Sequence, residues 1–294
     1  MIKEIANLGF EHVELSHGIR LSLVPGILKA LNERLISVAS LHNFCPLPVE
    51  VRTAAPNWRQ PSATSHWERD QWIRQTVRTI EFANKVEAPY VVLHSGSSFL
   101  ALLKNVRYKL EKAVNGRPIK ALWEDPSFLR LRETTLMRIR KKAPSTMERV
   151  RECFERVLPS AQANGVRLGI ENRAGLLECP MDADMADFVA ELAAVGPFGY
   201  WHDTGHAAIK QQLGLIDAYR HLEENAALLF GFHLHDTSPS GEDHQALGTG
   251  VIDFQRLRPF LGSGRVLTLE LSPKLSPSDV TASRDFLLRL LEIH

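Results

Sequence analysis

The sequence has few cysteines and no long hydrophobic run. Its three cysteines, Cys45, Cys153 and Cys179, are scattered and show no CxxC spacing. No stretch of about 18 apolar residues is present, which argues against a transmembrane helix. The opening residues, MIKEIANLGF, also lack the apolar segment of a signal peptide. These absences favour a cytoplasmic setting in which the thiols are reduced.

An excess of charge of either sign is also missing. The 35 lysines and arginines nearly balance the 34 aspartates and glutamates, which leaves a formal net charge of +1. No global field therefore attracts nucleic acid or a membrane, and either partner would need a local patch. With 294 residues, 44% of them hydrophobic, the chain can bury a large core. We expect one domain over residues 1–294.

Seven short segments share one pattern, in which apolar or β-branched residues lead to a polar residue and then to Gly, Asn, Ser or Pro. Helix-like patterns lie between them, such as STMERVRECFERVLPSAQANG with its Ser/Thr start and Asn-Gly stop. Alternation of strand and helix predicts parallel strands joined by right-handed crossovers. The seven predicted strand segments are 13–18, 36–43, 90–96, 167–172, 198–205, 230–237 and 266–273.

The order of residues within these strands favours a barrel. In RLGIEN, Leu168 and Ile170 share one face, while Gly169 and Glu171 share the other, because strand side chains alternate. The segments at 230–237 and 266–273 divide in the same way. Apolar residues would face helices and ionisable residues would face a common interior. This predicts an α/β barrel of the TIM (β/α)8 type, with an open doubly wound sheet as the alternative.

Ionisable residues stand at six successive strand ends, which meet at one rim in a TIM barrel. One such residue is ordinarily structural. Six together would be costly to bury without compensation, and a divalent cation would offset their repulsion. The six residues are His42, His94, Glu171, Asp203, His233 and Glu270.

The chain resembles the xylose isomerase-like TIM barrels, which include the sugar phosphate isomerase/epimerase group and its relative endonuclease IV. The motifs that carry this resemblance are IEN at 170–172, DTGH at 203–206, HLHD at 233–236, LGTGVIDF at 247–254 and LEL at 269–271. The resemblance implies that Glu171, Asp203, His233 and Glu270 bind the metal, with His235 as the rival of His233. Mn²⁺, Mg²⁺, Co²⁺ and Zn²⁺ all suit such a ligand set.

The resemblance also implies a reaction. In the sugar isomerases and epimerases of this family, a metal polarises the carbonyl of a keto sugar and a carboxylate removes the proton beside it. Glu171 and Glu270 would then be the acid/base pair on either side of an enediolate. Isomerisation, epimerisation and dehydration all begin in this way. The sequence leaves the choice among them open, as it does the identity and phosphorylation of the sugar.

Two alternatives remain. Endonuclease IV is a three-zinc phosphodiesterase acting on abasic DNA, but the text after IEN (RAGLLECP) and after DTGH (AAIKQQLG) differs from its pattern. A non-catalytic metal-binding relative is the other alternative, although every presumed ligand is present. The remaining nuclease ligand positions match His42, His94, His206, Glu242 and His244, with glutamate at 242 in place of the usual aspartate. His206 could be a ligand of such an additional metal, or it could contact Asp203 or the substrate.

Two long insertions follow the third and fourth strands of the family, at about 44–70 and about 98–145. The first carries Trp58 and Trp67, which are candidate contacts to the face of a sugar. The second is basic, with twelve lysines and arginines against four acids between Lys104 and Lys142. It could be a solvated helical hairpin, a sugar phosphate site or a lid. We expect both insertions to cover the substrate.

The N-terminal segment departs from the family pattern. A strand and a helix usually precede the segment that reads GFEHVEL here, yet MIKEIANLGF reads as the end of that helix. We therefore expect seven barrel strands, with the first one missing. Open strand edges would lower stability or favour a homodimer.

Overall fold

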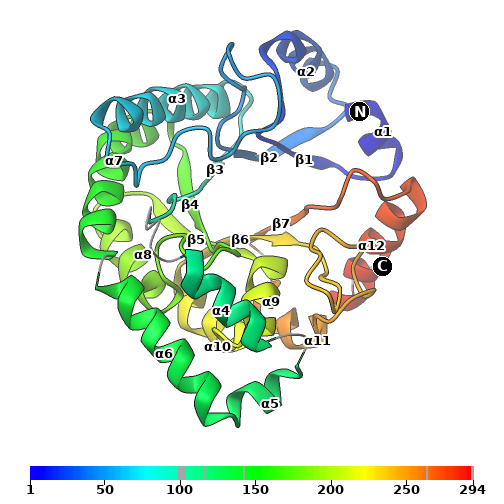
Figure 1. The fold of residues 1–294 in the computed structure, drawn as a ribbon. Coiled ribbons are helices and arrows are strands. Elements are labelled where there is room, and N and C mark those ends of the chain that lie inside the picture. Colours follow the sequence, from blue (N-terminus) through cyan, green and yellow to red (C-terminus); the bar gives the residue numbers. More distant parts are fainter. Residues whose placement is uncertain (99–103, 115–116, 142, 263, 293–294) are drawn as a thin grey trace. The chain divides into compact units, whose positions relative to one another are not determined.

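The computed structural model describes residues 1–98, 104–114, 117–141, 143–262 and 264–292. Two compact units make up the chain (Figure 1). Unit 1 comprises Met1–Gly96, Arg149–Glu171 and Phe188–Trp201. Unit 2 comprises Ser97–Glu148, Asn172–Asp187 and His202–His294.

Unit 1 contains parallel strands that pair in chain order, as the crossover pattern predicts. In the pairing of the third and fourth strands Val91 lies opposite Leu168, and in the next pairing Gly169 lies opposite Gly199. The last strand runs on from unit 1 into unit 2. The strands are β1 (His12–Leu15), β2 (Ser37–His42), β3 (Tyr90–Leu93), β4 (Arg167–Glu171) and β5 (Phe198–Asp203).

Two long helices, α3 (His66–Lys85) and α7 (Ala143–Asn164), lie side by side on unit 1 (Figure 1). Trp72 of α3 stacks on Phe154 of α7, with ring centroids 5.5 Å apart. As its Asn-Gly signal predicts, α7 ends at Asn164, and the glycine that follows adopts a positive φ of 66°. The other helices with residues in this unit are α1 (Ile2–Asn7), η1 (Leu21–Leu23), α2 (Val24–Asn32) and α8 (Met185–Ala193).

Unit 2 contains the parallel pair β6 (Leu229–Leu234) and β7 (Val266–Leu269), in which His233 lies opposite Thr268. Several of its helices begin with side-chain caps, for instance Asp203 before α9. The helices are α4 (Lys104–Val114), α5 (Ile119–Trp123), α6 (Pro126–Arg140), η3 (Asp182–Asp184), α9 (Thr204–Gln212), α10 (Ala218–Asn225), η4 (Ala226–Leu228), α11 (Phe254–Leu257), η5 (Arg258–Phe260) and α12 (Pro277–Leu290).

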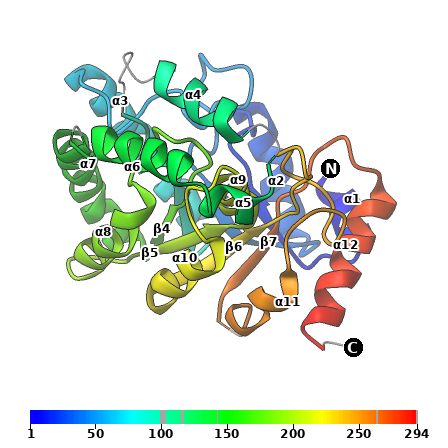
Figure 2. The ribbon, with the colours of Figure 1, turned by 60° about the horizontal axis from the view of Figure 1, so that its bottom comes forward.

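The second predicted insertion folds into helices that pack on the rest of unit 2. Leu110 and Val114 of α4 form a small core with Leu122 of α5 and Phe128 of α6, and partly buried leucines of other unit 2 segments pack against it. Helices α4 and α6 lie side by side (Figure 2). Of the residues 98–145 assigned to this insertion, 99–103, 115–116 and 142 lie outside the described residues. The described part is more than a solvated hairpin, because it buries an apolar core.

The first predicted insertion, at about 44–70, contains a loop and the start of a helix. The loop ends at Ser65 and α3 begins at His66, so Trp67 lies in a helix, and the extent of the insertion stays a prediction. The reason is a helix start that the sequence contains: Ser65 Oγ accepts a hydrogen bond from the backbone N–H of Glu68, three residues on.

Each of the seven predicted strand segments overlaps one observed strand, and the opening segment is the helix α1, as expected. The strands begin within one residue of the predicted starts but end before the predicted segments do, and β7 stops at Leu269, just before Glu270. Across the described ranges, no helix is both long and apolar enough to cross a membrane.

Candidate metal-binding sites

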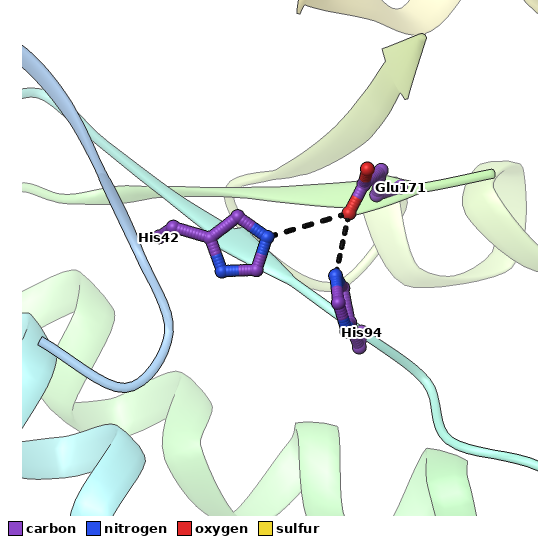
Figure 3. Close-up of side chains that lie close together, drawn as sticks. All are labelled: His42, His94 and Glu171. Atoms are coloured by element: carbon purple, nitrogen blue, oxygen red, sulfur yellow. Dashed lines mark ion pairs between the residues drawn. The ribbon is translucent and has the colours of Figure 1, made fainter. Parts of the chain in front are cut away.

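Unit 1 brings together His42 at the end of β2, His94 just after β3 and Glu171 at the end of β4 (Figure 3). Glu171 Oε2 lies 2.7 Å from His94 Nε2 and 3.5 Å from His42 Nε2. All three side chains are buried. Three potential metal ligands thus converge at the positions that the strand-end pattern predicts.

The outer nitrogens of both imidazoles face hydrogen-bond acceptors. His42 Nδ1 lies 3.0 Å from the carbonyl oxygen of Asn43, and His94 Nδ1 lies 3.0 Å from Asn57 Oδ1. Each Nδ1 therefore carries the proton, and each Nε2 is directed at Glu171. A neutral ring would then direct a lone pair at a carboxylate, so either a proton or a cation must lie between them. This arrangement suits a divalent cation.

Two residues near this cluster were not predicted. Asn57 fixes His94, as described above, and His17 packs edge-on against His42 with ring centroids 4.7 Å apart. The rings of His42 and His94 are in similar contact at 4.6 Å. Asn57 lies in a loop outside the predicted strand segments, whereas His17 lies at the polar end of the segment 13–18, where the strand-end pattern could have identified it.

The predicted sugar-contacting tryptophans lie around an arginine. The Arg59 guanidinium lies 4.4 Å from the centroid of Trp58 and 4.7 Å from that of Trp67. Trp58 also packs edge-on against Phe44 at 6.0 Å. These contacts order the loop, and a role of the two tryptophans in sugar binding stays a prediction.

Unit 2 brings together Asp203, His233 and Glu270, each of which offers an atom within 4.8 Å of the others. His233 Nδ1 lies 3.0 Å from Glu270 Oε2 and 4.0 Å from Asp203 Oδ2. Asp203 and His233 are fully buried, whereas the Glu270 side chain is 29% exposed. Two carboxylates and an imidazole in this arrangement are the donor set expected for a divalent metal.

Asp203 is held from several sides. Its backbone N–H donates to Asn172 Oδ1 at 2.7 Å, and Asn172 Nδ2 donates back to the Asp203 carbonyl at 3.0 Å. The Asp203 carboxylate caps α9, because Oδ1 accepts the backbone N–H of His206 at 2.7 Å. The motif DTGH is thus a helix start, and it also places the second carboxylate oxygen near His233.

His206 lies beside Asp203. Its Nδ1 is 3.0 Å from the Asn172 carbonyl and 3.3 Å from Asp203 Oδ2. This position fits the predicted contact of His206 with Asp203. His206 belongs to none of the ligand clusters found in the described part of the chain.

His235 also contacts Asp203, through Nε2 at 3.0 Å from Oδ1 and 3.1 Å from Oδ2. Burial lowers the pKa of His235, but the Asp203 carboxylate, which also accepts its hydrogen bond, and Glu270 outweigh burial and raise the pKa to about 9. The amide of His244 opposes protonation, because it donates to His235 Nδ1 at 2.8 Å. In either protonation state, Nε2 carries the proton that points at Asp203.

The other nuclease-like positions are only partly assembled. His244 Nδ1 lies 3.0 Å from the Glu270 carbonyl, and the rings of His235 and His244 are 4.3 Å apart, so His244 joins a cluster with His235 and Glu270. Glu242 is exposed and belongs to none of the ligand clusters among the described residues. A role of Glu242 as an additional metal or substrate contact stays a prediction, and in this structure its side chain is exposed to solvent.

His202, next to Asp203 on β5, is buried against an aromatic ring. Its ring packs edge-on against Phe232 at 5.5 Å. Burial lowers its pKa, and with a smaller effect from the nearby His221 the pKa falls to about 3. His202 also lines a cavity of about 920 Å³, which the α4–α5 segment, α9 and the loop after β6 enclose. Neutral His202 is therefore part of the packing of unit 2.

Solved structures with similar folds include several sugar epimerases. L-ribulose 3-epimerase has a TM-score of 0.66 and 16% identity, with 98% of this chain and 86% of that chain covered. D-psicose 3-epimerase with D-tagatose, from Clostridium cellulolyticum H10, has a TM-score of 0.63 and 15% identity, covering 99% and 92%. A protein described as a putative xylose isomerase, from Rhodospirillum rubrum, has a TM-score of 0.67 and 16% identity, covering 99% and 92%.

A comparison with curated proteins finds no match. Residues 2–289 match the family described as xylose isomerase-like TIM barrel, and the predicted fold class is therefore confirmed. The chain belongs to the xylose isomerase-like TIM barrel family.

Proposed function

We propose that the protein is a divalent-metal-dependent isomerase or epimerase of a keto sugar or sugar phosphate. Membership of the xylose isomerase-like family supports this reaction class. The similarity to structures described as L-ribulose 3-epimerase and D-psicose 3-epimerase is in line with it. The reaction requires a proton to be removed from the carbon beside a carbonyl and returned to the sugar.

The observation that carries the proposal is the triad of Asp203, His233 and Glu270 in unit 2. Their donor atoms lie within 4.8 Å of one another, and the two acids share the imidazole of a fully buried histidine. Such an arrangement suits Mn²⁺, Mg²⁺, Co²⁺ or Zn²⁺. We assign these three residues as ligands. Glu171 lies in the unit 1 cluster with His42 and His94, and its assignment as a ligand together with these three residues comes from the IEN motif.

The surroundings of each residue indicate whether it suits metal ligation or proton transfer. When bound, the metal would supply a positive charge that polarises the substrate carbonyl. Asp203 is fully buried and its oxygens accept several hydrogen bonds, so it suits ligation and not proton transfer. Glu270 is partly exposed, so it can reach a substrate and exchange a proton with it. The family resemblance assigns Glu171 as the other member of the acid/base pair.

The test is a screen of keto sugars and their phosphates. Metal-stripped protein is supplied with Mn²⁺, Co²⁺, Mg²⁺ or Zn²⁺, and products are identified by NMR. Glu270→Gln should lower kcat by about 10²–10⁴-fold, the usual contribution of a general acid or base. Glu242→Gln is the matched control, because Glu242 is exposed and lies outside the ligand clusters. Turnover of no sugar with any metal would contradict the proposal and favour a non-catalytic relative.

One observation favours a second candidate, an endonuclease IV-like phosphodiesterase. A single-metal epimerase does not require a separate ligand cluster, yet unit 1 directs His42 Nε2 and His94 Nε2 at Glu171. Multinuclear phosphodiesterases use adjacent metals to stabilise the attacking and leaving oxygens. The unit 1 cluster fits such an additional metal.

Elemental analysis of protein purified without chelator separates the two candidates. About one metal per chain supports the sugar enzyme, whereas about three zinc ions per chain support the nuclease. His94→Ala is the second arm of this test. It should leave sugar turnover largely intact if the sugar enzyme needs Glu171 but not His94, and it should abolish cleavage of abasic DNA if the nuclease is correct.

A further inference from the structure

We infer that His235 is a positioning residue, whose Nε2–H donates to Asp203 and fixes that carboxylate for a bound cation. The inference rests on the proposed function, because it takes Asp203 to be a metal ligand. It also removes His235 from the candidate ligands, where the sequence placed it as the rival of His233.

The first argument concerns the proton on the ring. In the neutral ring the backbone N–H of His244 donates to His235 Nδ1 at 2.8 Å, so the lone pair of Nδ1 is in use; in the protonated ring Nδ1 carries a proton and faces the Asp236 carbonyl at 3.4 Å. The ring proton is then on Nε2, which lies 3.0 and 3.1 Å from the two oxygens of Asp203. With both nitrogens occupied in this way, His235 offers no lone pair to a metal.

The second argument concerns the loop that supplies the amide. His244 has a positive φ of 54°, which is uncommon for a residue other than glycine. Two backbone hydrogen bonds between Asp236 and Gln245, at 3.0 and 3.1 Å, close the loop around it. The His244 side chain is held in turn by the carbonyl of Glu270 at 3.0 Å. An uncommon backbone conformation is thus held where it directs an amide at His235.

The third argument comes from Gly205, the glycine of DTGH. Gly205 lies in the first turn of α9 and does not have a positive φ, so its backbone conformation does not require glycine. A Cβ atom at this position would collide with His235 Cε1 and would lie 2.5 Å from Nδ1. Within a helix, glycine is less favourable than alanine. Close approach of the His235 ring is the reason for this glycine.

Without His235, Asp203 would lose the donor that spans both of its oxygens. Contacts to Asp203 that do not involve His235 include the backbone N–H of His206, 2.7 Å from Oδ1, and His206 Nδ1, 3.3 Å from Oδ2. Loss of a group that orients a metal ligand typically weakens metal affinity by about 10–100-fold. We expect that loss here.

Three substitutions test separately the two hydrogen bonds of the His235 ring, the one that Nε2–H donates to Asp203 and the one that Nδ1 accepts from the His244 amide. In His235→Gln the amide nitrogen can take the place of Nε2 and keep the donation to Asp203. In His235→Asn the carbonyl oxygen can take the place of Nδ1 and keep the bond from the His244 amide, but the side chain is too short to reach Asp203. His235→Leu keeps only the volume.

Mn²⁺ affinity is measured by calorimetry on chelator-stripped protein, and thermal unfolding is recorded without metal. We expect His235→Asn and His235→Leu to bind Mn²⁺ about 10–100-fold more weakly, with His235→Gln within a few-fold of wild type. Gly205→Ala, which displaces the ring without removing it, should weaken binding in the same direction. A structural role alone would lower Tm in the variants and leave the Mn²⁺ affinity of the folded protein unchanged, which would overturn the inference.

Three further outcomes are informative. Equal losses in His235→Gln and His235→Asn would make His235 a metal ligand and would overturn its assignment as a positioning residue. Wild-type protein that binds no divalent cation would overturn both the proposed function and this inference. Tight Mn²⁺ binding and sugar turnover by wild type, together with unchanged affinity in His235→Asn, would overturn the inference alone.

Discussion

The low pKa of His202 predicts a loss of stability in mild acid. Burial lowers the pKa of this imidazole from its ordinary 6.5 to about 3 in the folded protein. Below pH 6.5 the unfolded chain binds a proton that the folded protein does not bind. Because the unfolded state then holds more protons, the free energy of unfolding must fall as the pH falls from about 6.5 to about 3.

The magnitude follows from the shift. Each pH unit below 6.5 costs about 1.4 kcal/mol, so the loss is about 2 kcal/mol at pH 5 and about 5 kcal/mol by pH 3. His202→Leu removes the titrating group and keeps an apolar side chain against Phe232. The wild type should therefore lose about 2 kcal/mol more than the variant between pH 7.5 and pH 5.

The assay is urea unfolding of both proteins at pH 7.5, 6 and 5, with a chelator present so that metal binding does not contribute. Comparing the change with pH in each protein cancels the effects of all other titrating groups. If wild type and His202→Leu lost the same stability over this range, His202 would not be held neutral by burial, and the reasoning would be refuted.

Three other predictions concern buried groups. Burial raises the pKa of the Cys153 thiol to about 12, so iodoacetamide at pH 8 should modify this thiol only after the protein unfolds. Rapid modification of Cys153 in the native protein, detected by mass spectrometry, would contradict this prediction. Lys210 is buried, with Nζ 2.8 and 2.9 Å from the two Asp182 oxygens. Lys210→Met should therefore lower the free energy of unfolding in urea by about 3 kcal/mol, and adding Asp182→Asn should restore part of that loss. An unchanged urea midpoint in Lys210→Met would refute the pairing. A Cβ atom on Gly169 would lie 2.9 Å from the Trp201 ring, so Gly169→Ala should cost about 1–3 kcal/mol, seen as a lower Tm, whereas an unchanged Tm would show that the ring moves aside.

The strands could be predicted because their signal is local. In RLGIEN the alternation and the terminal polar residue are visible within six residues, and β4 spans Arg167–Glu171. The same local pattern identified His42 and His94, which the structure brings to Glu171, and Asp203 and Glu270, which it brings to His233.

Contacts between distant segments could not be predicted in this way. Asn57 reaches His94 across 37 positions, and His235 reaches Asp203 across 32. Neither pairing leaves a local pattern, so the sequence could not distinguish His235 as a ligand from His235 as a hydrogen-bond donor. The start of α3 is different, because the spacing of Ser65 and Glu68 was a visible helix-start signal within the segment assigned to a loop.

Some expectations depend on properties outside a single folded chain. The cytoplasmic setting and the homodimer stay predictions, as does the covering of the substrate by the two insertions. The apolar core of α4, α5 and α6 nevertheless corrects the interpretation of the basic stretch. The charges of this stretch indicate a solvated face. The spacing of Leu110 and Val114, four residues apart on one helix face, indicates a buried one.

The most direct test of the proposed function is exchange of the substrate proton with solvent. Ketohexoses, ketopentoses and their phosphates are incubated with Mn²⁺-loaded protein in D₂O, and deuterium at the carbon beside the carbonyl is measured by NMR and mass spectrometry. We predict incorporation by wild type and by Glu242→Gln, with loss in Asp203→Asn and Glu270→Gln. Two results would contradict the assignment of these residues to a metal-dependent proton transfer. One is that wild type incorporates deuterium into no sugar, and the other is that Asp203→Asn and Glu270→Gln incorporate as much deuterium as wild type.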